Sequence, residues 1–529
     1  MENAEAFIFR NVEFDGRVYV KVMGLSPDQS CMVTLYKEGQ VLRSLSGQVV
    51  MFDNQQAGRY QAEVNYTGGA GVSGLLKTRE ITISAVGKTL PSTVKPTTKS
   101  TPEVFSPVKG VTRYYLQIKL DHDDSLARLK QGALTQSPLF SRVRGRATYE
   151  KLPNNKLMGD IIPRTYYVDP GCTFDELVAI VTELEQLDYV VYCTVVPDTT
   201  GMAAPDLPPR ETPSSLTLAP HVTEPTPLFQ SLQTYLGDGV SSRQLGMNVL
   251  EAWGIGEYGK AATVRHLDFG VYRNHEDLRN NITVVSSRPE TEDCNHGTAS
   301  TGCIAASKNT IGVVGIAHGC HFNFYDTGSL DLIIRDAVPG DIVSLDIQLQ
   351  GPSNFLPMVH NRSWWDKIKS LVDKGVVVIM AAGNGGLDLS VQAGNMNQFG
   401  DSGGFLAGAC YHTNGRKVYF SNYKYAGATI NSWGDWSVVT TGYGSLQKME
   451  GNNRNYSKDY SGTSSATPLC AGALALIQSY MITHFGTFLN ASWMRHVLSV
   501  TGYNEGSADA IGRRPNVMAA LRFVRTHFA

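Results

Sequence analysis

Residues 461–468 read Ser-Gly-Thr-Ser-Ser-Ala-Thr-Pro and lead into the apolar run 469–477. Gly462 allows a tight turn, and Pro468 suits the first turn of a helix, where a missing backbone N–H costs little. A serine just before this helix lies at its positive end, near free backbone N–H groups. An acyl-transfer enzyme needs such a place for its nucleophile and oxyanion. Because Ser is also a favoured helix cap, the segment alone predicts Ser464 as either a cap or a nucleophile.

Three other segments carry residues suited to the same chemistry. His296 lies in Asn-His-Gly-Thr-Ala, residues 295–299, which opens another predicted helix. Asp268 follows the predicted strand 263–267, at the edge where open parallel sheets place their sites. Asn384 follows the apolar run 376–382 between two glycines, where its amide would donate to an oxyanion. Each also has an ordinary interpretation, as a satisfied histidine or as a turn residue.

The part of the chain with these segments, residues 233–529, alternates predicted strands and helices, as parallel α/β folds do. Strands are predicted at 263–267, 341–345 and 376–380, and helices at 297–306, 363–374 and 468–483. We therefore expect an α/β domain with a mostly parallel sheet flanked by helices.

The first 232 residues divide into four predicted regions. Residues 1–87 contain short alternating strands, at 17–22, 61–66 and 79–83, typical of a β-sandwich-like domain. Residues 88–108 are rich in Thr and Pro and form a predicted linker. Residues 109–198 predict a small α+β domain, with strands at 114–120 and 190–196 and a helix at 173–187 capped by Thr173. Residues 199–232 are a second, Pro-rich linker.

Composition excludes several classes of protein. The formal net charge is -2 over 529 residues, so the basic excess of a nucleic-acid binder is missing. No apolar run approaches the roughly 20 residues that span a bilayer, and we expect no membrane span. The N-terminus lacks the pattern of a secretory signal, which slightly favours a cytoplasmic location. The eight cysteines show no paired CxxC pattern, so we expect no metal site and mostly reduced thiols.

With the four segments in view, the sequence resembles the subtilisin-like serine peptidases, the subtilases. The order Asp268, His296, Asn384, Ser464 matches that family, as do the words His-Gly-Thr, Ala-Ala-Gly-Asn and Gly-Thr-Ser-x-Ala-x-Pro. Residues 274–278 and 312–317 add further matches, and the resemblance covers roughly residues 235–525. It implies a subtilisin-like fold and a serine endopeptidase that hydrolyses protein substrates, without a required cofactor.

The resemblance also implies roles for these residues. Ser464 would attack the scissile carbonyl, His296 would act as general base and acid, and Asp268 would orient His296. The Asn384 side chain and the Ser464 N–H would form the oxyanion hole. Residues 109–198 resemble the family's propeptide, which acts as a chaperone and inhibitor of its own enzyme, and the Pro-rich linker would be the place of processing.

Some residues depart from the family pattern. The substrate-binding strand would comprise Gln348, Leu349, Gln350 and Gly351, and Gln350 stands where the family usually has a glycine. Phe269 replaces the usual Thr or Ser after the aspartate, which puts the support of Asp268 in doubt.

Three smaller expectations concern specificity, thiol sensitivity and metals. Asp401 is either an exposed loop acid or a charge that favours a basic P1 residue, and Cys294 is either a small buried residue or a reactive thiol near the site. The family often holds structural calcium, but no acidic loop with ligand spacing allows ligands to be named.

Other classes fit less well. A sedolisin-like peptidase uses Glu and Asp where this chain has His296. An α/β-hydrolase would have Gly-x-Ser-x-Gly, with its histidine after the serine. A catalytically inactive subtilisin-fold binding protein is the remaining alternative, and the presence of all four residues argues against it.

Overall fold

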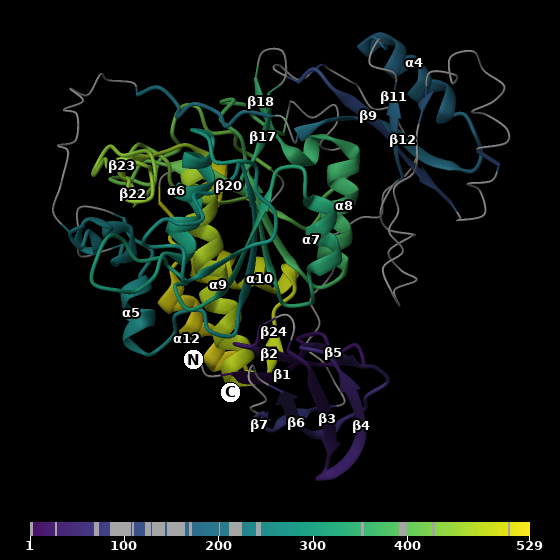
Figure 1. Cartoon of the computed structure of the whole chain (residues 1–529), viewed down its shortest axis with the longest axis vertical. Coiled ribbons are helices and arrows are strands. Elements are labelled where there is room, and N and C mark those ends of the chain that lie inside the picture. The colour runs from purple at the N-terminus through teal and green to yellow at the C-terminus, as the bar shows by residue number, and fades with distance from the viewer. Residues whose placement is uncertain are drawn as a thin grey trace.

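The computed structural model describes the chain in three parts (Figure 1). We call them the sandwich (residues 4–84), the α/β unit (111–199) and the C-terminal part (225–528), with a crossing segment (202–210) between the last two. The described residues are 4–26, 29–67, 73–84, 107, 111–121, 128–129, 143–144, 164–168, 172–199, 202–210, 225–239, 245–350, 354–390, 399–425, 429–505 and 508–528. The predicted linker 88–108 therefore lies almost wholly outside the described residues.

A seven-stranded, fully parallel sheet forms the centre of the C-terminal part. In spatial order its strands are β14 (Ile282–Val284), β15 (His321–Asp326), β13 (Thr263–Asp268), β16 (Ile342–Leu345), β19 (Val377–Ala381), β20 (Phe405–Cys410) and β21 (Thr429–Trp433). Strands β16 and β19 are buried along their whole length, which explains their continuous apolar sequences. The predicted parallel sheet and the three predicted strands are confirmed.

Helices cover both faces of this sheet (Figure 1). One face and its hydrophobic cluster involve α5 (Val249–Gly254), α6 (Cys294–Ala305), α9 (Thr463–Phe485), α10 (Ala491–Thr501) and α12 (Val517–Phe528). The other face packs on α7 (Leu330–Asp336) and α8 (Arg362–Asp373). The remaining elements are η5 (Gln230–Leu232), η6 (Thr234–Leu236), η7 (Met358–His360), α11 (Ala508–Ile511) and the hairpins β17 (Gln348–Gln350)–β18 (Phe355–Pro357) and β22 (Val438–Thr441)–β23 (Tyr456–Tyr460).

Helix α9 passes through the core of the C-terminal part. It begins at Thr463, five residues before Pro468, so the prediction that Pro468 lies in the first turn is wrong. Pro468 has no N–H for the carbonyl of Ser464, and the Tyr460 hydroxyl donates to that carbonyl instead, at 3.0 Å. By length and composition α9 would be able to cross a membrane, but 94% of its most apolar window is buried in the protein. It is therefore a core helix.

The sandwich consists of two packed sheets. One has the order β24 (Thr487–Phe488), β1 (Glu5–Asn11), β2 (Val18–Met23), β5 (Val49–Phe52). The other has the order β4 (Gln40–Ser46), β3 (Cys31–Lys37), β6 (Gly58–Thr67), β7 (Ser73–Lys77), with β8 (Ile81–Ile83) also paired to β6. The predicted alternating strands are present in β2, β6 and β8. Strand β24 comes from the C-terminal part, so the first sheet joins both ends of the chain.

The α/β unit is a four-stranded antiparallel sheet with a helix. The order of its strands is β10 (Val143–Arg144), β11 (Arg164–Val168), β9 (Tyr114–Leu120), β12 (Val190–Pro197). Helix α4 (Phe174–Leu184) lies between β11 and β12 in the chain. Thr173 caps α4 in a reciprocal capping box with Glu176, as its sequence predicts.

A core substitution tests the assignment of α9 as a buried helix. Leu474 is fully buried in α9, and Leu474→Ala should lower the free energy of unfolding by about 2–5 kcal/mol because it leaves a cavity. Urea unfolding followed by tryptophan fluorescence measures this change. Val500→Ala, on the 49%-exposed Val500 of α10, is the control and should have little effect. Equal unfolding midpoints for the two variants would contradict the assignment.

Candidate active site

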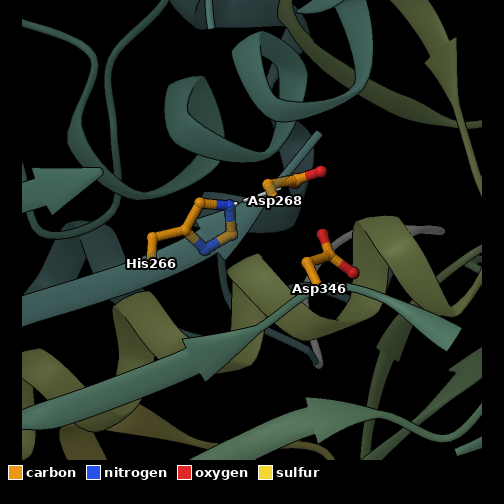
Figure 2. Close-up of side chains that lie close together, drawn as sticks. All are labelled: His266, Asp268 and Asp346. Atoms are coloured by element: carbon orange, nitrogen blue, oxygen red, sulfur yellow. Dashed lines mark hydrogen bonds and ion pairs between the residues drawn. The ribbon is translucent and has the colours of Figure 1, made fainter. Parts of the chain in front are cut away.

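Asp268 lies at the carboxyl end of β13 and is fully buried. Its Oδ1 accepts a hydrogen bond from Nδ1 of His296 at 2.6 Å and one from the backbone N–H of Phe269 at 2.6 Å. Its Oδ2 lies 3.2 Å from Nε2 of His266 (Figure 2). Burial alone would raise the pKa of Asp268, but His296 and His266 hold it well below its usual value. Asp268 is therefore a buried carboxylate that stays ionised.

His296 lies in the first turn of α6 and is only 1% exposed. Because Nδ1 is bonded to the Asp268 carboxylate, it carries the proton and Nε2 is the free, basic nitrogen. Nε2 has no hydrogen-bond partner among the described residues. The imidazole ring packs edge-on against Phe269 and Tyr460, with centroid distances of 5.4 and 5.9 Å. His296 is thus held by Asp268 and two aromatic rings, with Nε2 left without a hydrogen-bond partner among the described residues.

Ser464 is the second residue of α9 and is 7% exposed. Its backbone N–H belongs to the first turn, where helices leave N–H groups without intrahelical acceptors. Tyr460 connects it to the histidine, since its hydroxyl bonds the Ser464 carbonyl while its ring packs on His296. Within the described residues no hydrogen bond joins the Ser464 hydroxyl to His296, a contact that commonly tightens only with bound substrate.

Asn384 lies just after β19 and presents its side chain to the start of α9. Its Oδ1 accepts hydrogen bonds from the N–H and the hydroxyl of Thr463, at 2.9 and 3.0 Å. These two bonds fix the amide orientation and leave Nδ2 as the donor. A methyl group on Gly462 would lie 3.2 Å from this Nδ2. The Asn384 amide and the Ser464 N–H therefore meet beside the same turn.

The predicted substrate-binding strand is β17, which pairs with β18 as a hairpin. Gln348 is buried, and its Oε1 accepts the backbone N–H of Asn384 at 2.8 Å. Leu349 is 5% exposed and packs in the cluster below the sheet, whereas Gln350 is half-buried at the end of the strand. Gly351 lies outside the described residues. The structure thus gives Gln348 a contact that holds Asn384, which the sequence did not indicate.

Two neighbours of Asp268, the histidine His266 and the carboxylic acid Asp346, were not predicted from the sequence as part of the site. His266 is fully buried, and its Nδ1 lies 3.1 Å from the hydroxyl of Ser344 on β16. Asp346 follows β16, is fully buried, and accepts the Ser300 hydroxyl at 2.7 Å. Burial, and then the nearby Asp268 charge, raise the pKa of Asp346 well above its usual value. Asp346 is therefore a neutral acid beside the ionised Asp268.

Potential metal-ligand atoms of His266, Asp268 and Asp346 lie within 4.8 Å of one another (Figure 2). Both nitrogens of His266 are already within hydrogen-bond distance of Ser344 and Asp268, and Asp268 has three partners of its own. We therefore assign this cluster to the support of Asp268. Among the described residues no other such group of His, Cys, Asp and Glu was found, so structural calcium stays a prediction without named ligands.

The crossing segment lies over this site. Pro208 Cγ would be 3.4 Å from a methyl group on Gly462, next to the Asn384 amide. Trp436 Nε1 donates to the Pro208 carbonyl at 2.6 Å, and the Tyr419 hydroxyl donates to the Pro209 carbonyl at 2.8 Å. Pro208 therefore occupies the space beside the turn before Ser464.

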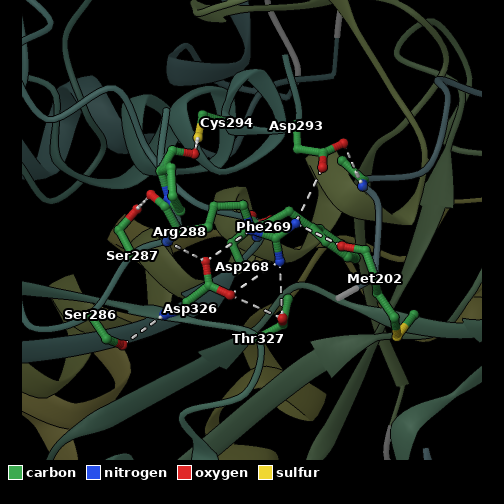
Figure 3. Close-up of polar contacts among 12 residues, drawn as sticks. Met202, Asp268, Phe269, Ser286, Ser287, Arg288, Asp293, Cys294, Asp326 and Thr327 are labelled. Carbon is green, nitrogen blue, oxygen red and sulfur yellow. Dashed lines mark hydrogen bonds and ion pairs between the residues drawn. The ribbon is translucent and has the colours of Figure 1, made fainter. Parts of the chain in front are cut away.

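Arg288 fixes the start of the crossing segment (Figure 3). Its guanidinium bonds the Asp326 carboxylate at 3.0 and 3.1 Å and donates to the Met202 carbonyl at 2.7 Å. Asp293, the residue before α6, bonds Arg288 and also accepts the N–H of Ala204 at 2.9 Å. The same charged cluster thus holds the crossing segment and the start of the His296 helix.

Three expectations from the sequence are decided here. Asp401 is paired with two nitrogens of Arg495 on α10, so it does not offer a free charge to a basic P1 residue, and that hypothesis is wrong. Cys294 is buried, and burial raises the pKa of its thiol, so the ordinary interpretation holds. Phe269 supplies no hydroxyl, but His266 and the Phe269 N–H support Asp268 instead. Among the described residues no disulfide involves Cys31, Cys294, Cys303, Cys320, Cys410 or Cys470.

Comparisons with known proteins find serine peptidases similar to this chain. Residues 259–509 match the family model described as the Subtilase family. Subtilisin DY of Bacillus licheniformis is 29% identical over 277 residues, which cover 49% of this chain and 89% of that protein. A thermostable alkaline protease of Halalkalibacterium halodurans is 30% identical over 253 residues, covering 44% of this chain and 61% of that relative. Among solved structures, an epidermin leader peptide processing serine protease of Staphylococcus aureus matches 78% of this chain and 98% of its own, at 16% identity and a TM-score of 0.48.

The neutral state of Asp346 has a measurable consequence. A carboxyl group whose pKa is raised in the folded state makes folding less favourable as pH rises from its ordinary pKa near 4 toward its folded value. Asp346→Asn removes this pH-dependent loss. The free energy of unfolding of the variant should therefore rise relative to that of the wild type by up to about 1.4 kcal/mol per pH unit in that range. Urea unfolding between about pH 5 and about pH 8 measures the difference. Asp53→Asn, at an exposed position, is the control, and a difference that does not change with pH would refute the neutral state of Asp346.

Proposed function

We propose that the chain is a serine endopeptidase of the subtilase type through residues 259–509, and that Asp268, His296 and Ser464 are its catalytic triad. The observation that carries this proposal is the 2.6 Å contact between Asp268 and Nδ1 of His296, which leaves Nε2 without a partner among the described residues. Tyr460, whose ring packs on His296 and whose hydroxyl bonds the Ser464 carbonyl, lies between the two residues. The substrates are peptide bonds of proteins, and no cofactor takes part.

The proposed reaction follows from the arrangement of these groups. The Ser464 oxygen attacks the carbonyl carbon of the scissile bond, and its proton passes to Nε2 of His296. Asp268 stabilises the imidazolium that forms. The carbon–nitrogen bond then breaks as His296 returns the proton to the leaving amine. Water hydrolyses the acyl–Ser464 ester in the same way, with its proton passing through His296 to the serine oxygen.

The developing negative charge on the carbonyl oxygen needs fixed donors. The Asn384 Nδ2 and the Ser464 N–H are proposed as these donors, because neither is used by another group among the described residues. Gln348 and Thr463 hold the backbone and the amide oxygen of Asn384, so the amide has little to reorganise during the reaction. Such preorganisation is what makes an oxyanion hole effective.

We further propose that the described form is an inhibited zymogen. Ser464 and His296 are 7% and 1% exposed, and Pro208 of the crossing segment lies beside the proposed oxyanion hole. A substrate would need the space that the crossing segment fills. The α/β unit is then the enzyme's own inhibitory partner, and processing between residues 211 and 224 would separate it from the C-terminal part.

Labelling with a fluorophosphonate probe tests the triad and the oxyanion hole. Wild-type protein, once processed and freed of the α/β unit, should be labelled at Ser464, and Ser464→Ala and His296→Ala treated in the same way should not be labelled. Asn384→Ala should lower kcat about 100- to 1000-fold with little change in KM, since the amide acts on the transition state. Asn453→Ala, on an asparagine away from the site, serves as the control. Persistent absence of labelling on folded, processed wild-type protein would favour the inactive binding protein instead.

Processing is tested separately with purified full-length protein. We expect wild-type protein to convert on incubation to a form that begins within residues 212–224, as seen by intact mass and N-terminal sequencing. Ser464→Ala should stay at full length, and adding a trace of active enzyme shows whether the cut also occurs between molecules. A Ser464→Ala preparation that shortens by itself at the same place would rule out autoprocessing.

A further inference from the structure

The sandwich is joined to the C-terminal part through the backbone. Strand β1 pairs in parallel with β24, with Arg10 opposite Thr487 and Asn11 opposite Phe488. The Arg10 N–H donates to the Gly486 carbonyl and the Val12 N–H donates to the Phe488 carbonyl, each at 3.0 Å. The first sheet of the sandwich is thus completed by residues that lie more than 470 positions later in the chain.

The side chains at this junction are apolar and buried. Phe9 and Tyr19 of the sandwich stack on each other and pack edge-on against Phe488, with centroid distances near 6 Å. Two residues of the C-terminal part complete the cluster. Ala261 lies two residues before β13, and Ile482 lies in α9. Val12 reaches further and belongs to the main hydrophobic cluster of the C-terminal part, where it is 2% exposed. Separation would expose this whole cluster to water.

A buried ion pair lies beside the aromatic cluster. Lys21 is 7% exposed, and its ammonium lies 3.0 Å from the carboxylate of Asp341, which is fully buried at the start of β16. The same ammonium bonds Thr263, and Arg265 bonds the other oxygen of Asp341 at 2.8 Å. Removing the sandwich would leave Asp341 with one of its two cationic partners. A buried charge that loses a partner is strongly destabilising, so this contact opposes separation.

The α/β unit is attached in a different way. It packs on the first half of α8, where Asp366 bonds the Lys119 ammonium at 2.7 Å and the Tyr192 hydroxyl at 3.0 Å. Arg362 lies over the Tyr192 ring and 3.4 Å from Glu185. Val196 of β12 also joins the apolar cluster of α7 and α8, so both interfaces combine apolar and charged contacts. The sandwich junction differs by the backbone pairing of β1 with β24 and by the buried Lys21–Asp341 pair. Because breaking it would leave strand ends and a buried charge without partners, we expect the sandwich junction to outlast the contact of the α/β unit.

We propose that the sandwich stays bound to the C-terminal part after processing and keeps the α/β unit tethered to the enzyme. This inference rests on the proposed function for the inhibitory role of the α/β unit. A cut between residues 211 and 224 alone then leaves the enzyme latent. Only a second cut, in residues 85–106 between the sandwich and the α/β unit, lets the inhibitor leave.

The tether matters because it makes inhibition independent of enzyme concentration. A partner held on the same chain rebinds at an effective concentration that can reach the order of millimolar. After the first cut the α/β unit would rebind while still covalently joined to the bound sandwich rather than from bulk solution. Dilution would therefore not activate the singly cut enzyme, but it would activate enzyme cut at both places.

The first experiment measures retention of the sandwich without any need for activity. Recognition sequences for a site-specific protease are inserted after Ser214, after Lys95, or after both, in full-length Ser464→Ala protein. After cutting is complete on a denaturing gel, size-exclusion chromatography in high salt separates what is no longer bound. We expect the sandwich to co-elute with the C-terminal part in all three proteins, and the α/β unit to separate only in the doubly cut protein. Separation of the sandwich from the protein cut after Lys95 would overturn the proposal.

A pair of variants shows whether the junction described above is responsible. Phe9→Ala should increase the fraction of sandwich lost from the cut protein at least tenfold, since it removes the centre of the aromatic cluster. Met51→Ala, on a 45%-exposed residue of the same sheet, should behave as the wild type. Equal retention in both variants would contradict the assigned junction.

The second experiment repeats the cuts in protein with Ser464 intact. We expect the rate of peptide hydrolysis per mole of enzyme to stay low at every dilution for the enzyme cut only after Ser214. For the doubly cut enzyme, this specific activity should rise at least tenfold on dilution. Equal activity of the two forms, with the sandwich still bound, would overturn the tether. If neither form hydrolyses peptides or reacts with a fluorophosphonate, the proposed function fails, while the chromatography still decides whether the sandwich stays bound.

Discussion

A buried, ionised carboxylate is the constraint on which the site depends. Asp268 has no contact with water and must receive its stabilisation from neighbouring groups. Three donors meet this need: His296 Nδ1, the Phe269 N–H and His266 Nε2. Each donor also fixes something else. The first sets the tautomer of His296, and the third ties β13 to β16 through Ser344. A neutral Asp346 beside it avoids a second buried negative charge.

The parallel sheet explains why these groups meet. Strands β13, β16 and β19 run in one direction, so Asp268, Asp346 and Asn384 all follow strand ends at the same edge. Helix α9 brings the start of its first turn to that edge through Thr463, which is bonded to Asn384. The sheet therefore positions Asp268 and Asn384 at the ends of its strands. Side-chain hydrogen bonds then connect Asp268 to His296 and Asn384 to Thr463.

Much of this arrangement is predictable from sequence. The apolar runs at β13, β16 and β19 have the length and composition of buried strands, and the motifs follow them directly. His266 was predictable in principle, because residues two apart on a strand face the same side, which places it beside Asp268. Asp346 follows Ser344 by the same rule. Their buried state was not visible in the sequence, since an isolated histidine or aspartate there has ordinary roles.

Other features depend on contacts that leave no local pattern. Strand β24 is only two residues long, and nothing near Thr487 indicates a partner at the start of the chain. Asp401 looked available for a substrate because its partner, Arg495, lies on a helix almost a hundred residues later. Pro468 fits a first helical turn by propensity, but the start of α9 is set earlier by Gly462 and by the bonds of Thr463 to Asn384. Tertiary contacts decided each of these cases.

The folded unit extends beyond residues 259–509, the region that matches the family model. Asp341, the residue before β16, is neutralised in part by Lys21 of the sandwich. The other end of β16 leads to Asp346 and to Gln348, which holds Asn384. One strand therefore has its buried charge balanced by the sandwich at one end and supports the proposed oxyanion hole at the other. The ion pair between Lys21 and Asp341 therefore makes the sandwich part of the folded unit that holds β16, the strand that leads to Asp346 and Gln348.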